Sequence, residues 1–173
     1  MVTADAAVIR RGDPFVMEQF AHPSFGYVPW VPRVSDAMHW GLVHCAPDAT
    51  LRELATLMTD AVVHCVVVLD APGDRESLWG VVSDLDLVAA ATVRSLDDQR
   101  AGGTAMTPAI TAFPHESLET AAQRMTTHGV SHLVVVDEAR HRPIGVVSTL
   151  DVVGRLVGES PRGEILGLSE LPL

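Results

Sequence analysis

The chain of 173 residues contains no lysine, and its 12 arginines face 22 acidic residues, which gives a formal net charge of −10. No basic run or stripe occurs, so the sequence disfavours a nucleic-acid partner, whose phosphates require clustered positive charge. No stretch approaches the roughly 18 apolar residues of a membrane span, and the N-terminus lacks the apolar core of a signal peptide. We therefore expect a cytoplasmic protein with neither a nucleic-acid nor a membrane partner.

Cysteine is also scarce. Cys45 and Cys65 form no CxxC pair and lie in predicted strands, so each is interpreted as a small buried apolar residue rather than part of a disulfide framework. Eight histidines and the two cysteines are residue types that form metal sites and Cys-His nucleophiles, yet no HExxH, HxH or CxxC spacing occurs. In a strand, the neighbours His44 and Cys45 point to opposite faces. We therefore expect no catalytic residues and no enzyme, and we keep metal binding as a less favoured alternative.

The composition is that of a globular protein, with 47% apolar and 20% charged residues. Residues 1–33 are expected to be irregular because prolines interrupt them, although a short helix could span 14–21. Aromatic residues in this segment indicate that it packs on the rest of the chain or on a partner. Residues 158–173 form a tail that we expect to pack locally, fray or dock on a neighbour.

An internal repeat dominates the remainder. Residues 80–86 read GVVSDLD and residues 145–151 read GVVSTLD, and the apolar run Val66–Asp70 matches Leu133–Asp137 at an offset of 67 residues. The offsets change only in expected loops. Such a repeat indicates two copies of one supersecondary unit, and therefore two copies of one potential ligand site.

Each unit is predicted to be β-α-β-β-α, which leaves one face of its sheet bare, so that two units bury their bare faces together. The expected fold class is α/β, with tandem repeats related by pseudo-two-fold symmetry. The expected strands are 42–45, 65–69, 78–82, 110–112, 132–136 and 144–147, and the expected helices are 50–59, 83–95, 117–127 and 148–157. The expected boundaries are an N-terminal segment 1–33, repeat 1 at 34–95, a linker 96–103, repeat 2 at 104–157 and the tail 158–173.

This order of elements, with G-h-h-[ST]-x-x-D at the last strand-to-helix junction of each unit, resembles the CBS domain. The pair resembles a CBS tandem, or Bateman module, over about residues 34–157. The resemblance implies a regulatory module that requires no cofactor. It implies an adenosine-containing ligand such as AMP, ADP, ATP, NAD or S-adenosylmethionine in clefts between the repeats. It also implies a disc-like homodimer, and it leaves any regulated protein unidentified.

The repeated motif carries chemistry at a strand-to-helix junction. Its glycines, Gly80 and Gly145, end a strand where another backbone or a ligand needs close approach. A hydroxyl at a helix N-terminus can donate to a phosphate, and a carboxylate in the first turn can accept both hydroxyls of a ribose. The resemblance implies these roles for two serines and two aspartates: Ser83, Ser148, Asp86 and Asp151. The alternative is that each Ser-x-x-Asp is a capping box, which needs no ligand.

The resemblance further implies that the base lies against the segment after each opening methionine and against the residues that lead into the apolar strand. In the second repeat the candidates are Thr107, Ile110, Thr111 and His132. The first repeat offers His39–Val43 and Val63–Cys65, where Trp40 could fill or reshape a pocket. We therefore prefer the second-repeat set, and the second-repeat motif, for a nucleotide contact.

Few cations are available near the expected clefts. The candidates are Arg52, Arg124, Arg142 and His132, and Asp84 adds a negative charge beside the first phosphate position. A polyphosphate needs cations to offset its charge. The sequence therefore favours AMP, adenosine or S-adenosylmethionine over bare ATP. A ligand-free structural or partner-binding dimerisation module stays open as the alternative.

Overall fold

The computed structural model describes residues 31–70 and 77–156, which belong to one compact unit that begins at Val31. The helix expected at 14–21 and the tail 158–173 lie outside the described residues. The elements in chain order are η1 (Val34–Asp36), β1 (His39–Trp40), β2 (His44–Cys45), α2 (Leu51–Ala61), β3 (Cys65–Asp70), β4 (Ser77–Ser83), α3 (Asp84–Ala91), η2 (Leu96–Asp98), α4 (Ala101–Thr104), β5 (Thr111–Ala112), α5 (Leu118–His128), β6 (His132–Val136), β7 (Pro143–Ser148) and α6 (Thr149–Leu156).

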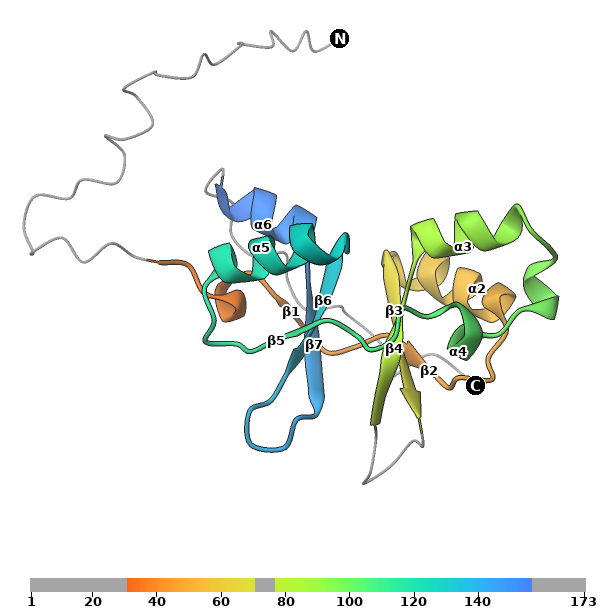
Figure 1. Ribbon diagram of the computed structural model, residues 1–173, viewed down its shortest axis with the longest axis horizontal. Helices are drawn as coiled ribbons and strands as arrows, with labels where there is room; N and C mark the ends of the chain where they lie inside the picture. Colours follow the sequence, from red (N-terminus) through yellow and green to blue (C-terminus); the bar gives the residue numbers. More distant parts are fainter. Residues whose placement is uncertain (1–30, 71–76, 157–173) are drawn as a thin grey trace, which may run out of the picture. The chain divides into compact units, whose positions relative to one another are not determined.

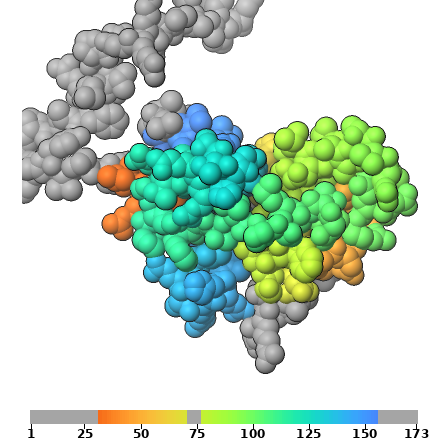
Figure 2. Space-filling model, viewed as in Figure 1, coloured from red at the N-terminus to blue at the C-terminus, as the bar shows by residue number. Residues whose placement is uncertain are grey.

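The two sheets lie face to face between two layers of helices (Figure 1). Their strand orders are β1-β7-β6-β5 and β2-β3-β4. The sheets meet through an apolar cluster that contains Val67 and Leu69 of β3 and Val134 and Val136 of β6, each at most 5% exposed. The predicted α/β class and the joint burial of the bare sheet faces are confirmed. Figure 2 shows the two repeats in contact across the viewed face.

Local signals set the ends of the helices. Thr50 caps α2 by accepting from the backbone N–H of Glu53, and Ser117 caps α5 in the same way through Thr120. Gly129 ends α5 with a φ of +64°, in the left-handed region that suits glycine. The helix expected at 83–95 ends earlier, at Ala91. The Gln99 side-chain amide donates to the carbonyl of Ala90 near this end, which satisfies one of the acceptors that a helix terminus leaves open.

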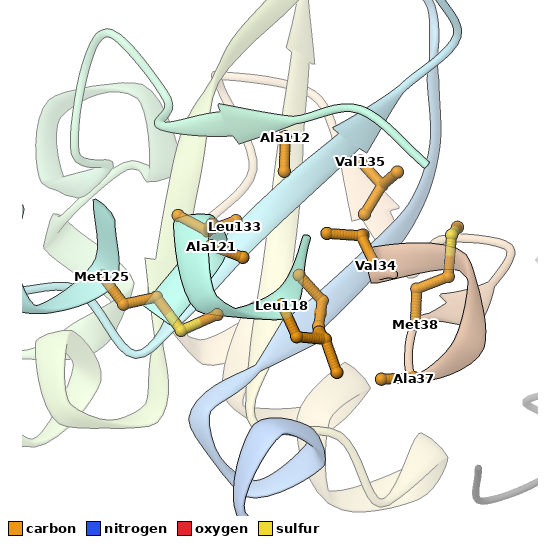
Figure 3. Packing of buried hydrophobic residues seen from close by; sticks show 10 residues of the cluster. Val34, Ala37, Met38, Ala112, Leu118, Ala121, Met125, Leu133 and Val135 are labelled. Carbon is orange, nitrogen blue, oxygen red and sulfur yellow. The ribbon is translucent and has the colours of Figure 1, made fainter. Parts of the chain in front are cut away.

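The segment that opens each repeat packs on the opposite repeat. β1, from the first repeat, pairs antiparallel with β7 of the second. Just before it, Val34, Ala37 and Met38 enter the core of the second repeat beside residues of α5 and β6 (Figure 3). In the equivalent arrangement of the other repeat, Met106 of the second repeat bridges to Val81 of β4 in the first. This exchange was not predicted, since the sequence analysis assigned each opening segment to its own repeat.

The stretch 96–103, expected as a linker, folds onto the first repeat. The Ala101 N–H donates to the Ala49 carbonyl at 2.9 Å, and the Leu51 N–H donates to the Gln99 carbonyl at 3.1 Å. Ala101 is fully buried in the same core as Leu51 and Leu54. The chain therefore leaves the first repeat only after α4 and the bridge from Met106 to Val81 of β4.

Candidate ligand-binding clefts

The motif glycines are required by the exchanged segments. A Cβ built on Gly80 would lie 2.5 Å from the Met106 carbonyl oxygen and 2.9 Å from the Ala105 Cβ. A Cβ on Gly145 would overlap the His39 carbonyl oxygen and the end of the Met38 side chain. The expected close approach is confirmed, and the approaching group is backbone from the opposite repeat. Each motif is thereby brought beside the opening segment of the other repeat.

Both Ser-x-x-Asp motifs form a capping box. The backbone N–H and the hydroxyl of Ser83 donate to Asp86 Oδ2 at 2.7 and 2.6 Å, and the Asp86 N–H donates back to Ser83 Oγ at 3.3 Å. Ser148 and Asp151 repeat this arrangement, with corresponding distances of 2.7, 2.6 and 3.2 Å. Each serine hydroxyl therefore already donates to its own aspartate. A phosphate at the helix N-terminus would have to compete for that proton.

One cavity lies at the second-repeat motif, and we call it the Asp151 cleft. Its volume is about 360 Å³. Its walls combine Ser148 and Asp151 with two segments of the first repeat: the opening segment, through His39, and the approach to β3, through His64 and Cys65. The first-repeat set, which the sequence analysis did not prefer, therefore faces the second-repeat motif.

The smaller cavity lies at the first-repeat motif, and we call it the Asp86 cleft. Its volume is about 160 Å³, and it combines Ser83 and Asp86 with Ile110 and His132 of the second repeat. Thr107 and Thr111, the other two candidates for base contact, line neither cavity. Thr111 pairs with Val134 in β5 instead, and the methyl group of Thr107 lies 3.0 Å from the position of a Cβ on Gly80.

The carboxylates of the two clefts have different partners. Asp151 Oδ1 lies 3.0 Å from His39 Nε2, and the side chains of His39 and Asp151 are 23% and 7% exposed. In the described part of the chain, no hydrogen bond reaches Asp86 Oδ1. His39 was not among the predicted site residues. Its adjacency to Met38 was the available signal, since this is the position where the resemblance places base contacts.

His132 lines both cavities. Burial lowers its pKa, although the carboxylate of Asp84 opposes this effect. The Asp84 carboxylate in turn lies 2.8 Å from His64 Nδ1, and this hydrogen bond holds the pKa of Asp84 below its usual value. Imidazoles and carboxylates, rather than permanent cations, therefore supply the charge between the two clefts.

Of the four expected cations, only His132 is part of the cavity linings. Among the residues that the structure places, no arginine lines either cavity. Arg52 pairs with Asp97 at 2.6 Å, and Arg124 pairs with Glu116 at 2.7 Å. Two of the candidates are therefore occupied by acidic partners outside the clefts.

The cysteines are free thiols. Burial is the main cause that raises the pKa of Cys65 to about 12 and that of Cys45 to about 11. A thiol that stays protonated is a poor nucleophile and a poor metal ligand. Within residues 31–70 and 77–156, no group of three or more His, Cys, Asp or Glu side chains is arranged to hold a metal ion. Within the same ranges, no helix has the length and apolar character to cross a membrane.

Comparison with known sequences agrees with this architecture. The sequence model of the CBS domain matches residues 34–92 and 103–158. The CBS domain-containing protein YhcV of Bacillus subtilis is 28% identical over 138 residues, which cover 79% of this chain and 94% of YhcV. A homoserine O-acetyltransferase of Methanococcoides burtonii is 33% identical over 113 residues. That match covers 64% of this chain, which spans only 22% of the transferase.

Solved structures share the fold. The CBS domain pair of protein MJ0100, in complex with 5′-methylthioadenosine and S-adenosyl-L-methionine, superimposes with a TM-score of 0.64 at 21% identity and covers 74% of this chain and 97% of that one. A hexameric CBS-CP12 protein from bloom-forming cyanobacteria gives a TM-score of 0.66 at 19% identity, and the match covers 78% of each chain.

Proposed function

The chain belongs to the CBS-domain family, and on that premise we propose that it is a regulatory module that senses an adenosine-containing ligand of low charge. The pair of motif clefts carries this proposal. Each cleft sets a Ser-Asp motif opposite the apolar entry segment of the other repeat. The MJ0100 domain pair, which has the same fold, is complexed with two adenosine compounds.

The charges around the clefts support a ligand with few phosphates. Asp86 and Asp151 are the carboxylates of the linings, and Asp84 lies close enough to affect His132 electrostatically. Because no arginine of the described residues lines either cleft, a triphosphate would meet uncompensated repulsion there. Neutral 5′-methylthioadenosine and adenosine avoid this cost. S-adenosylmethionine, which carries a sulfonium and an ammonium group, gains attraction from the same carboxylates.

Size favours the Asp151 cleft as the main site. Pockets for small molecules range from about 300 to 1,000 Å³. The Asp151 cleft, at about 360 Å³, falls in this range, whereas the Asp86 cleft, at about 160 Å³, is smaller than a bound nucleoside requires. The Asp86 cleft would need to open, or would hold only part of a ligand. This agrees with the sequence-based preference for the second-repeat motif.

Regulation rather than catalysis fits the chemistry of the clefts. The thiol of Cys65, which lines the larger one, has a strongly raised pKa. The acetyltransferase relative aligns over only 22% of its length, so its named activity gives no basis for assigning that reaction to this chain. A cytoplasmic location stays a sequence-based prediction.

Self-association is part of the proposal. Leu85 and Val88 of α3 are 73% and 63% exposed, and Leu150 and Val153 of α6 are 49% and 52% exposed. Leu85 corresponds to Leu150 and Val88 to Val153, at the same offset that relates Gly80 to Gly145. A homodimer that covers both helices would remove these side chains from water. In light-scattering measurements, we expect the wild-type chain to have the mass of a dimer and Val88→Asp to shift it toward monomer. A monomeric wild type would refute the dimer.

Isothermal titration tests the ligand. The protein, stripped of nucleotide, is titrated with adenosine, 5′-methylthioadenosine, S-adenosylmethionine, AMP, NAD and ATP. Asp151→Asn and Asp86→Asn are the variants, because asparagine retains an oxygen for the helix cap while it removes the charge. We expect binding that weakens in the order of increasing negative charge and that Asp151→Asn reduces more than Asp86→Asn. If a folded protein binds none of these compounds, the module is the ligand-free partner-binding alternative.

A further inference from the structure

The two clefts share a scaffold but offer a ribose different acceptors. A carboxylate has about four acceptor positions, two on each oxygen. In both motifs, Oδ2 receives two hydrogen bonds from its serine. Asp151 Oδ1 is also engaged, by His39 Nε2 at 3.0 Å, whereas Asp86 Oδ1 has no partner in the described residues. A ribose diol would therefore find two open acceptor positions on Asp86 Oδ1 but only one on Asp151 Oδ1.

His39 is fixed beside Asp151 by its backbone. It pairs with Val146 in the β1–β7 ladder, and its carbonyl oxygen lies against Gly145. Because an ionised carboxylate only accepts, Nε2 carries the proton and donates it to Asp151. Nδ1 is buried and lacks a hydrogen-bond partner in the described part of the chain. The imidazole is thus a fixed part of the wall, and Asp151 is its hydrogen-bond partner.

The equivalent position in the other cleft does not reproduce this contact. The repeat offset of 68 residues near the opening methionines relates His39 to Thr107. Thr107 lines neither cavity. The asymmetry is therefore specific to His39 rather than a consequence of the shared fold.

We infer that His39 helps determine ligand specificity in the Asp151 cleft: by occupying one of the two acceptor positions on Asp151 Oδ1, it prevents this carboxylate from accepting both hydroxyls of a ribose diol there. The inference rests on the proposed function. The Asp151 cleft then selects its ligand more through the base and the apolar wall than through the two hydroxyls. The Asp86 cleft keeps the ability to select for the diol.

The test compares adenosine with 2′,3′-dideoxyadenosine, which lacks both hydroxyls. Titrations use an Asp86→Asn background, so that the Asp151 cleft dominates binding. We expect the preference for adenosine over 2′,3′-dideoxyadenosine to increase by about tenfold or more in His39→Ala, because the acceptor position that is released allows one more hydrogen bond to a charged group. His39→Gln, whose amide can still donate to Asp151, should restore the wild-type ratio.

His64→Ala is the matched control. It removes an imidazole from the same cleft, but this imidazole is bonded to Asp84 rather than Asp151. We expect it to shift both affinities together and to leave their ratio unchanged. Thermal unfolding midpoints of all variants show that the fold is retained. An unchanged ratio in His39→Ala would overturn the inference.

A spectroscopic readout separates this inference from the proposed function. In the ligand-free protein, nitrogen-15 spectra of the His39 ring should show the tautomer protonated at Nε2, and Asp151→Asn should weaken that preference. A ring protonated only at Nδ1 would overturn the inference even if adenosine binds. Failure of every variant to bind either nucleoside would refute the proposed function and with it any role of His39 in selecting ligands.

Discussion

Replacing Gly80 with alanine tests whether the exchanged segments hold the two repeats together. The new Cβ would lie 2.5 Å from the Met106 carbonyl oxygen, a separation at which real Cβ atoms essentially never occur. That carbonyl accepts the Val81 N–H at 3.4 Å, while the Met106 N–H donates to the Val81 carbonyl at 2.9 Å. The oxygen must therefore retreat from Gly80, and its already long hydrogen bond breaks first.

The cost follows from these contacts. Overpacking a closely packed site costs about 1–3 kcal/mol. A lost backbone hydrogen bond adds about 1 kcal/mol. We therefore expect Gly80→Ala to reduce the free energy of unfolding by about 2–4 kcal/mol. For a chain of this size, that loss lowers the unfolding midpoint by about 5–15 °C.

Urea unfolding of Gly80→Ala and Gly103→Ala provides the assay. Gly103 lies in α4, is exposed, and has nothing within 4 Å of a built Cβ, so alanine there should be neutral or slightly stabilising. The slope of unfolding free energy against urea should stay unchanged if only the native contact is affected. If Gly80→Ala stays within about 0.5 kcal/mol of wild type, the size of a typical surface substitution, the close approach of Met106 is absent and the reasoning fails.

Two further predictions concern charge. Because burial lowers the pKa of His132 from the ordinary 6.5, the folded state binds fewer protons than the unfolded state just below pH 6.5. The free energy of unfolding should therefore fall as the pH drops below that value, and His132→Gln should flatten this dependence in unfolding curves between about pH 7.5 and 5.5. Arg124→Met should destabilise by about 1–3 kcal/mol because it leaves the partly buried Glu116 unpaired, whereas Arg52→Met, in an exposed pair, should cost less in the same assay.

The sequence predicted what its periodicity encodes. The apolar runs at 65–69 and 132–136 became the central buried strands β3 and β6, and the helices expected at 50–59 and 117–127 became α2 and α5. These features depend on local chemistry or on an apolar pattern of several residues. The internal repeat then implied that two bare sheet faces would meet, and the cluster shared by β3 and β6 confirms it.

The sequence did not predict that the opening segment of each repeat packs on the opposite repeat. β1 contains two residues, too few to show a period, and its partner β7 follows about a hundred residues later. The best available signal was the glycine of each motif. Gly80 and Gly145 indicated close approach by something, but a glycine does not identify the group that approaches it. The predicted site set was consequently grouped by repeat rather than across repeats.

The repeat also explains why fold and specificity were not equally predictable. Some positions have the same residue in both repeats, such as Gly80 with Gly145 and Asp86 with Asp151. These positions form the same scaffold in each repeat, and comparison of the two repeat sequences identifies them. The contacts that distinguish the clefts come from positions where the repeats differ. His64 and Asp84 form a hydrogen bond at 2.8 Å, whereas their equivalents by the same offsets are Ser131 and Thr149. His39, with no histidine at its equivalent position, engages Asp151. In a duplicated sequence, the positions that are identical in both repeats therefore predict the fold. The ligand preference of each cleft depends on the positions that differ, and only the structure shows which of these positions line the same cavity.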